Sequence, residues 1–366
     1  MSKIVDSTPR ADQFRMPGEF EKKAGCWLGW PERPDVWRNG GKPAQKVWVE
    51  IARAIAKSER VTIAVSHQQY ANARGMLPPE VRVVEMSTND AWFRDMGAMF
   101  LVNDETGETR GLDWGFNAWG GLEGGLYFPW DKDDMAAEKM CEIEGIDHYR
   151  GPMITEGGGL QCDGQGTLLT TESVILNPNR NPGLSKQQAE QIFYDYMAID
   201  KVLWLPRGCK FDETDGHIDD LACFVAPAEI LLSWTDDEND PQYEVYAEAY
   251  EILSQATDAR GRSLTIHKIH QPNPAVWTAE EASQVDVTAD ATQRLDGYKV
   301  MGSYINYYVG NSVVVVPEFD DPYDQPAQQL LSKLFPNREV IGIKNAREIL
   351  LGGGNIACIT QPQYGT

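Results

Sequence analysis

One cysteine and its glycine-rich approach are the first candidates for chemistry in this sequence. Cys358 stands in EILLGGGNIACITQPQYGT, directly after the glycines at 352–354. Glycine lets a backbone approach a ligand closely, so the thiol could be a nucleophile beside a bound substrate. A last core strand with an inert, buried thiol explains the same stretch equally simply. The stretch alone leaves both interpretations open.

A histidine surrounded by acids offers a group that can donate and accept protons. His217 lies in ETDGHIDDL, two residues before Asp219. Side chains two apart on an extended segment share a face, so we expect His217 and Asp219 to project together. A neighbouring carboxylate raises the pKa of an imidazole and keeps it charged near neutral pH. An acidic surface loop is the structural alternative.

Two further polar clusters could complete a site. NDAWFRDMG contains Asp95 among aromatic residues, and TEGGGLQCDGQG contains Glu156 directly before three glycines. A strand edge with a surface ion pair and an ordinary glycine turn are the structural alternatives. Cys162 competes with Cys358 as the nucleophile, although the adjacent Asp163 should raise the pKa of the Cys162 thiol and reduce its reactivity.

The spacing of these clusters indicates a repeat. The steps from Asp95 to Glu156 and from Glu156 to His217 are both 61 residues, and an apolar strand-like run follows each cluster. Repeated units that place polar groups at strand ends suggest radial repetition around a shared centre. We therefore expect these side chains to converge.

The rest of the sequence alternates between helix and strand patterns. Apolar spacing predicts helices over 43–58, 184–198, 241–259 and 324–335. Short apolar runs predict strands at 60–66, 81–86, 98–103, 166–171, 173–177, 201–206, 221–226, 229–234, 264–269, 312–317 and 339–343. No flexible linker divides the chain, so we expect one α/β domain over residues 1–366.

The composition of the chain limits the kinds of ligand and partner that we expect. The formal net charge of −22 makes nucleic acid an improbable ligand and favours capture of small cations. Six scattered cysteines fit a reducing cytoplasm, and neither a secretory signal nor a membrane-spanning run is evident. Zinc, phosphate-loop and dinucleotide patterns do not occur, so no metal or cofactor is expected.

The candidate groups suit a guanidinium substrate. Guanidinium is planar, carries five N–H donors, and pairs with carboxylates in a forked geometry. A cysteine protease needs cysteine and histidine but does not need several carboxylates aimed at one point. Attack of Cys358 on the central guanidinium carbon, with loss of ammonia, would use all the candidate groups.

Several motifs together resemble one enzyme family. The motifs are WPERPDVWRNGGKPAQ, NDAWFRDMG, ITEGGG with DGQGTLLTT, LNPNRNP, ETDGHIDD and GGGNIACITQ. In this order, from about Met16 to Gln361, they closely resemble agmatine deiminase, a branch of the guanidine-modifying pentein superfamily alongside bacterial peptidylarginine deiminases.

The resemblance implies a fold and a reaction. The fold would be a five-bladed α/β propeller of ββαβ units, and the protein a homo-oligomer. The reaction would be hydrolysis of agmatine to N-carbamoylputrescine and ammonia without metal or cofactor. By motif, Cys358 resembles the nucleophile and His217 the acid/base, while Asp95 and Asp219 resemble the guanidinium carboxylates and Glu156 joins His217. The residues implied to bind the rest of the substrate are Glu213 at the distal ammonium, Trp92 and Trp119 along the methylene tail, and the backbone at Gly353 and Gly354.

Some positions depart from the family pattern. Ala357 replaces a histidine beside the nucleophile, Pro362 replaces a glutamine, and Gly159-Leu160-Gln161 replaces Ser-Ile-His. RDTGP has become RDMGA at 94–98. A deiminase of another guanidino compound, such as arginine or peptidyl-arginine, and a weakly active amine-binding paralogue therefore stand as alternatives.

Overall fold

Five sheets share one order of strands. In each, an edge strand pairs antiparallel with its neighbour in the sheet. A helix then leads from that neighbour to a further strand that lies parallel to it. Parallel neighbours require such a crossover because the chain must return to the same end of the sheet. The structure is a computed structural model and describes residues 2–365.

The first sheet contains β18 (Thr360–Tyr364), β1 (Lys23–Gly29), β2 (Arg60–Val65) and β3 (Arg82–Glu85), so it joins the two ends of the chain. The second contains β4 (Met99–Val102), β5 (Thr109–Gly115) and β6 (His148–Ile154), and the third contains β7 (Gln161–Cys162), β8 (Thr167–Thr171) and β9 (Lys201–Leu205). The fourth contains β10 (Ala222–Ala226), β11 (Glu229–Trp234) and β12 (Thr265–His270), and the fifth contains β15 (Tyr308–Val309), β16 (Val313–Pro317) and β17 (Glu339–Ile343). A two-stranded sheet adds β13 (Ala275–Val276) and β14 (Lys299–Val300). The crossover helices are α1 (Lys42–Ile55), α5 (Ala136–Glu144), α7 (Lys186–Met197), α8 (Tyr243–Gln255) and α10 (Asp324–Leu334).

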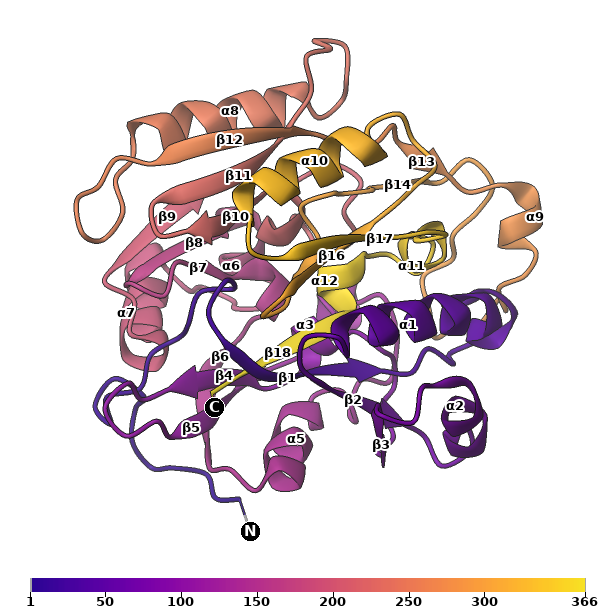
Figure 1. Cartoon of the computed structure of the whole chain (residues 1–366), viewed down its shortest axis with the longest axis horizontal. Helices are drawn as coiled ribbons and strands as arrows, with labels where there is room; N and C mark the ends of the chain where they lie inside the picture. The colour runs from indigo at the N-terminus through magenta and orange to yellow at the C-terminus, as the bar shows by residue number, and fades with distance from the viewer. Residues whose placement is uncertain (1, 366) are drawn as a thin grey trace.

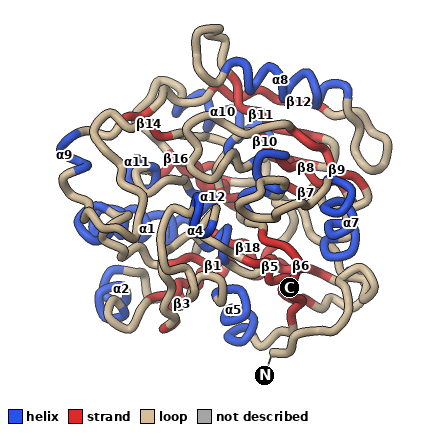
Figure 2. Tube along the Cα trace, turned by 180° about the vertical axis from the view of Figure 1, so that it is seen from behind, coloured by secondary structure: helices blue, strands red, loops and turns tan. Residues whose placement is uncertain are grey.

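Shorter helical segments connect these units. They are α2 (Tyr70–Met76), α3 (Phe93–Met96), α4 (Gly121–Gly124), α6 (Glu172–Ile175), α9 (Ala279–Ala282), α11 (Arg347–Leu350) and α12 (Ile356–Ile359), with 3-10 turns η1 (Arg38–Gly41), η2 (Gly157–Gly159) and η3 (Ile218–Asp220). Figure 1 shows α12 and α3 near the middle of the molecule, and Figure 2, from behind, also shows α12 near the middle.

The four predicted helices are confirmed as α1, α7, α8 and α10. In α1, Val47, Ile51 and Ile55 recur every four residues and are buried on one face.

Helix α7 begins after Ser185, whose hydroxyl accepts a hydrogen bond from the backbone N–H of Gln188, while the Gln188 side-chain oxygen accepts one from the backbone N–H of Ser185. This capping box satisfies two backbone donors that a helix start leaves free.

One predicted strand, residues 173–177, is wrong. Helix α6 occupies most of it, with Val174 and Ile175 buried. A short apolar run fits a buried helical turn as well as a strand, and here two prolines and three asparagines follow within residues 177–182. The other ten predicted runs contain strands of the structure.

The end of the chain is anchored rather than frayed. Strand β18 pairs antiparallel with β1, so that Thr360 faces Leu28 and Gln361 faces Trp27. Gln361 is buried and donates a 2.7 Å hydrogen bond to the carbonyl of Ala98. This pairing fixes the residues directly before β18, including Cys358.

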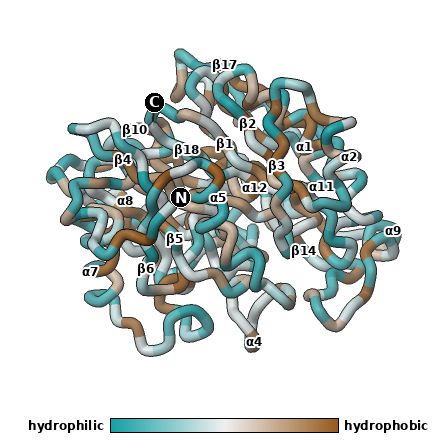
Figure 3. The backbone as a smooth tube through the Cα atoms, turned by 90° about the horizontal axis from the view of Figure 1, so that it is seen from below, coloured by the Kyte–Doolittle hydropathy of each residue, from teal (hydrophilic) through white to brown (hydrophobic). Residues whose placement is uncertain are grey.

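The exterior is mainly polar. In Figure 3 hydrophilic residues predominate around the outline of the molecule. Within residues 2–365, no helix combines the length and the apolar character that a membrane span requires.

Candidate active site

The candidate residues occupy equivalent places in successive sheets. Asp95 lies shortly before β4, Glu156 before β7, His217 before β10 and Cys358 before β18. Each of these strands is the one that pairs antiparallel with the central strand of its sheet. The equal spacing in the sequence therefore reflects a structural repeat, and it brings these side chains together.

The imidazole of His217 lies between two carboxylates. Its Nε2 is 3.4 Å from Glu156 Oε2, and its Nδ1 is 3.9 Å from Asp95 Oδ2. Burial alone would lower the pKa of His217, but the charges of Asp95, Glu156 and Asp219 outweigh it and raise the pKa to about 10. The imidazole is thus a cation and a proton donor at neutral pH.

The expected extended segment at His217 is wrong, although the expected neighbours are correct. Ile218–Asp220 form the 3-10 turn η3, because the carboxylates here turn into the protein rather than alternate across a sheet. A Cβ placed on Gly158 would lie 2.9 Å from Asp95 Oδ1 and 3.0 Å from Asp219 Oδ2. Two carboxylates therefore meet over a position that only glycine leaves open.

Asp95 and Asp219 differ in their hydrogen bonds. Asp95 accepts from the backbone N–H of Gly158 at 2.9 Å and from the indole N–H of Trp119 at 3.0 Å. Asp219 Oδ1 is buried without a partner among the described residues. Burial raises the pKa of both carboxyls, and His217 opposes the rise. An unpaired buried carboxylate oxygen is costly unless a ligand supplies a donor.

Cys358 lies on the short helix α12 and faces this carboxylate pair. Its Sγ is 3.9 Å from Asp219 Oδ2 and accepts a 3.1 Å hydrogen bond from the side chain of Asn306. Burial and then the charges of Asp219, Asp220 and Asp95 raise the pKa of the thiol. Without a cation between these groups, the sulfur therefore stays protonated.

The competing cysteine lies elsewhere. Cys162 is buried on β7 within the main hydrophobic core. Burial and the charge of Asp163 raise the pKa of its thiol, as the sequence predicts. The thiol pKa does not identify the nucleophile, because the pKa of Cys358 is raised as well. Cys358 is the better candidate because it lines a cavity together with Asp95.

The cavity at Cys358 is narrow and partly aromatic. The volume in it that a water molecule can occupy is about 20 Å³, and its walls include Trp92, Trp119 and Tyr127 besides Asp95. The Trp92 and Trp119 rings meet edge to face at 6.3 Å between centroids. Trp92 also donates a 2.8 Å hydrogen bond to Asp90 Oδ2, which fixes the orientation of its ring.

A buried ion pair lies at the cavity where the sequence predicts a lone acid. Glu213 is bound by Arg294 through its Nη2 at 2.6 Å and its Nε at 3.0 Å, and both side chains are buried. Arg294 also donates to the carbonyl of Gly352 at 3.0 Å and lines the cavity. Glu213 is therefore already neutralised by a cation that the sequence analysis missed.

The glycines before Cys358 make room for protein side chains. Gly353 has φ +113°, and a Cβ on it would clash with the Glu213 carboxylate. A Cβ on Gly354 would lie 2.7 Å from the Trp92 ring and 3.0 Å from Cys358 Sγ. Any side chain at these positions would displace the cavity wall.

Two further polar residues were missed by the sequence analysis. Arg180 is fully buried, holds Glu156 Oε1 at 3.1 Å, and donates to the carbonyl of Thr214 at 2.9 Å. Although burial would raise it, the pKa of Glu156 is lowered by the charges of Arg180 and His217. Asn306, the donor to Cys358, is also fully buried. Arg180 lies in the motif LNPNRNP, which could have indicated it. Asn306 could have been indicated by its place before β15, which corresponds to the place of Cys358 before β18.

Ala357, which departs from the family pattern beside Cys358, makes its hydrogen bonds through its backbone. The carbonyl of Ala357 accepts a 3.2 Å hydrogen bond from Arg94 Nε, and its N–H donates to the carbonyl of Asn306 at 3.3 Å. A methyl side chain leaves both hydrogen bonds intact. Replacement of histidine by Ala357 thus does not alter how the Cys358 segment is held.

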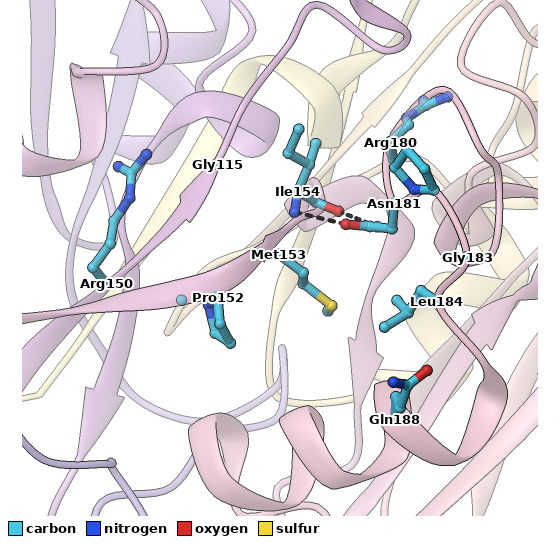
Figure 4. A pocket seen from close by; sticks show the side chains of 12 residues that line it. Gly115, Arg150, Pro152, Met153, Ile154, Arg180, Asn181, Gly183, Leu184 and Gln188 are labelled. Carbon is cyan, nitrogen blue, oxygen red and sulfur yellow. Dashed lines mark hydrogen bonds between the residues drawn. The ribbon is translucent and has the colours of Figure 1, made fainter.

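A wider hollow on the surface is separate from this cavity. Figure 4 shows Arg150, Met153 and Asn181 around it, between β6 and the segment that leads into α7. The Asn181 side chain binds the backbone of Ile154 on both sides, at 3.0 and 2.7 Å. The residues that line the hollow include neither cysteine, histidine nor carboxylate, so they offer no comparable chemistry.

Known proteins share both the sequence and this architecture. Residues 15–363 match the family of Porphyromonas-type peptidyl-arginine deiminases. An agmatine deiminase of Pseudomonas aeruginosa is 51% identical over 359 residues, which cover 98% of this chain and 97% of that protein. The solved agmatine deiminase of Enterococcus faecalis has a TM-score of 0.96 and 47% identity over all of both chains. A Campylobacter jejuni agmatine deiminase, at 24% identity and a TM-score of 0.80, shares the fold.

The chain therefore belongs to the Porphyromonas-type peptidyl-arginine deiminase family, in its agmatine deiminase branch, and has the α/β pentein fold of that branch. The resemblance inferred from the sequence motifs is confirmed.

Proposed function

We propose that this protein hydrolyses agmatine to N-carbamoylputrescine and ammonia through an amidino adduct on Cys358. The observation that carries the proposal is one narrow cavity that presents Cys358, Asp95 and two tryptophans, with Asp219 3.9 Å from the sulfur. Relatives named agmatine deiminase, similar over nearly the whole chain, support the choice of substrate.

The guanidinium group would bind between Asp95 and Asp219. Its N–H donors would fill the free acceptor at Asp219 Oδ1 and bridge to Asp95 in the fork that carboxylates favour. Its positive charge would offset the burial and the neighbouring negative charges that raise the pKa of both carboxyls and of the Cys358 thiol. Substrate binding would thereby favour loss of the thiol proton to solvent and leave a thiolate where it is needed.

The chemistry would then use His217 twice. The Cys358 sulfur adds to the central carbon, a proton passes from the imidazolium to one amino group, and the C–N bond breaks to release ammonia. The neutral imidazole next takes a proton from a water whose oxygen adds to the amidino carbon, which restores the imidazolium. The C–S bond then breaks, the hydroxyl proton of the tetrahedral adduct passes to the departing sulfur, and the ureido product leaves. Glu156, held by Arg180, would keep the imidazole oriented and protonated between cycles.

The aromatic walls suit an alkyl chain. Trp92 and Trp119 would pack on the methylene groups, with the backbone at Gly353 and Gly354 closing the other side. The distal ammonium would lie toward Glu213, whose carboxylate it would share with Arg294. The acidic composition, with a net charge of −22, would attract a dication such as agmatine.

Arg294 also favours a second candidate, free arginine. A buried guanidinium that lines the cavity is the cation that an α-carboxylate would need. Glu213 already pairs with this guanidinium, which weighs against arginine. The relatives named agmatine deiminase favour agmatine. A polypeptide substrate is the least suited, because Cys358, Asp95 and His217 are all buried at a narrow cavity.

The shared strand order of the five sheets supports a finer description of the fold. We propose that residues 1–366 form one domain in which the sheets are the five blades of an α/β propeller around the site. The residues before β4, β7, β10, β15 and β18 would then be the contributions of successive blades to one centre. Homo-oligomeric assembly remains a prediction of the family resemblance.

The direct test is turnover by the purified protein. Ammonia release and product formation should be followed with agmatine, arginine, a simple alkylguanidine and an arginine-containing peptide. The proposal expects agmatine to have the largest kcat/KM by a wide margin. Equal or greater efficiency with arginine would transfer the assignment to the second candidate, and no turnover of any guanidino compound would support an amine-binding role.

A further inference from the structure

Asn306 contacts the candidate nucleophile on two sides. Its Nδ2 lies 3.1 Å from Cys358 Sγ, and its Oδ1 accepts a 3.2 Å hydrogen bond from the Cys358 backbone N–H. Its own carbonyl accepts a hydrogen bond from Ala357 at 3.3 Å. The residue is fully buried directly before β15, so these contacts join the fifth sheet to the segment that carries the sulfur.

The orientation of the Asn306 amide is fixed by chemistry. A backbone N–H can only donate, so the side-chain atom that faces the Cys358 N–H must be the carbonyl oxygen. The amide nitrogen must then face the sulfur and donate to it.

We propose that Asn306 is a catalytic residue: its amide N–H donates to the Cys358 sulfur, stabilises the thiolate and aims it at the substrate carbon. The inference rests on the proposed role of Cys358 as nucleophile. It goes beyond that role by assigning the group that supports the thiolate from the protein side.

The surroundings of the sulfur explain why such a donor matters. The charged or titratable groups around Cys358 and its helix are Asp95 and Arg94 on α3, and His217, Asp219 and Asp220 at η3. The three carboxylates disfavour a negative sulfur, and Arg94 is directed to the carbonyl of Ala357. Among the described side chains, Asn306 is the one that donates a hydrogen bond to Sγ. Such a bond is stronger to a thiolate than to a thiol.

The position of Asn306 in the repeat supports the assignment. Asp95, Glu156, His217 and Cys358 stand before the antiparallel strands of four sheets, and Asn306 stands before the corresponding strand of the fifth. Each of the five sheets thus contributes a polar side chain from the same place. Asn306 completes the set.

The test measures the ionisation of Cys358 without any substrate. The pH dependence of its alkylation by iodoacetamide should be followed by peptide mass spectrometry in the wild type, Asn306→Ala and Asn306→Asp. For Asn306→Ala we expect the midpoint to rise by about one pH unit. The rate at pH 7 should fall severalfold, because greater basicity partly offsets the smaller thiolate fraction.

Asn306→Asp separates a donor from a merely structural residue. The carboxylate still accepts from the Cys358 N–H, so a structural role predicts behaviour close to that of the wild type. The proposed role predicts the opposite: with the donor gone and a charge beside the sulfur, the midpoint should rise further than in Asn306→Ala.

Asn311 provides a matched control. Its side chain also contacts one residue on two sides, but through backbone atoms alone: it accepts from the N–H of Lys23 and donates to the Lys23 carbonyl, both at 2.8 Å. Asn311→Ala should leave the Cys358 profile unchanged. An Asn306→Asp profile equal to that of the wild type would overturn the inference. This outcome is distinct from a failure of the proposed function, because agmatine turnover is not part of the measurement.

Discussion

His217 and Glu156 form a fully buried pair, with 3.4 Å between Nε2 and Oε2, although 61 residues separate them in the sequence. The pair joins the β10–β12 sheet to the β7–β9 sheet. Because Arg180 holds the other oxygen of Glu156, the carboxylate cannot turn away from the imidazole.

The first prediction concerns the charge of His217. Glu156→Gln should lower its pKa from about 10 by one unit or more, because the amide removes a facing negative charge. The imidazole resonance in an NMR titration measures the change. Glu229→Gln is the matched control: it removes the acid 3.1 Å from His267 on β12 and should leave His217 unaffected.

The same pKa predicts how stability depends on pH. A folded-state pKa of about 10, above the ordinary histidine pKa of 6.5, means that the folded state holds this proton more tightly. Its contribution to the free energy of unfolding is complete below about pH 6.5 and is lost as the pH rises through about 10. Denaturant titrations across this range should show the decline in the wild type. In His217→Gln the decline should be much smaller, and an equal decline would assign it to other groups.

The second prediction separates the two candidate nucleophiles. Cys358→Ser should reduce turnover more than about a hundredfold, because a hydroxyl is a far weaker nucleophile than a thiol. Cys162→Ala, which removes the core thiol on β7, should retain most activity per folded molecule. The measurement is steady-state ammonia release. The reverse pattern would move the nucleophile to Cys162.

The third prediction concerns the guanidinium carboxylates. Asp95→Asn and Asp219→Asn should each lower kcat/KM by about thirty-fold to several thousand-fold, which corresponds to the loss of about 2–5 kcal/mol from a buried charge pair. Asp113→Asn is the control, because Asp113 is also buried but pairs with Arg150 away from the cavity. A small effect at both Asp95 and Asp219 would mean that the cation binds elsewhere.

The fourth prediction tests the distal end of the cavity. Glu213→Gln should raise the KM for agmatine and spare a simple alkylguanidine, which lacks the ammonium. It should also improve the use of arginine, because Arg294 loses its partner and becomes free for a carboxylate. Glu281→Gln, which removes the acid of another Arg–Glu pair 2.8 Å from Arg347, should change none of these. Equal damage to agmatine and alkylguanidine would place Glu213 in the reacting cluster or the fold.

Much of the architecture follows from the sequence because local patterns decide it. The amphipathic spacing of apolar residues is enough to predict helix α1, and short apolar runs are enough to predict strands β10 and β16. Strand β18 was missed because TQPQY reads as polar, yet all five residues are buried and Gln361 finds a backbone partner across the sheet boundary. Burial of that kind depends on tertiary pairing, which no local window contains.

Part of the site could also be predicted from the sequence and part could not. The equal spacing of Asp95, Glu156 and His217 predicted that they meet, since equivalent positions of repeated units lie around one centre. Arg294 could not be found, because it lies in a loop segment before β14 and reaches Glu213 only through the folding of distant parts of the chain. A lone charged residue in a loop is most often a solvated one.

The central claim is that Cys358 carries the substrate carbon during turnover. Wild-type enzyme quenched in acid during turnover of agmatine, and His217→Ala mixed with agmatine, should be analysed by intact mass and by peptide mapping. The account predicts a protein heavier by agmatine less ammonia, with the added mass on Cys358, and accumulation in His217→Ala because its adduct cannot activate water. Turnover of agmatine by the wild type with unmodified Cys358 in every quenched sample, and no adduct in the His217 variant, would contradict it.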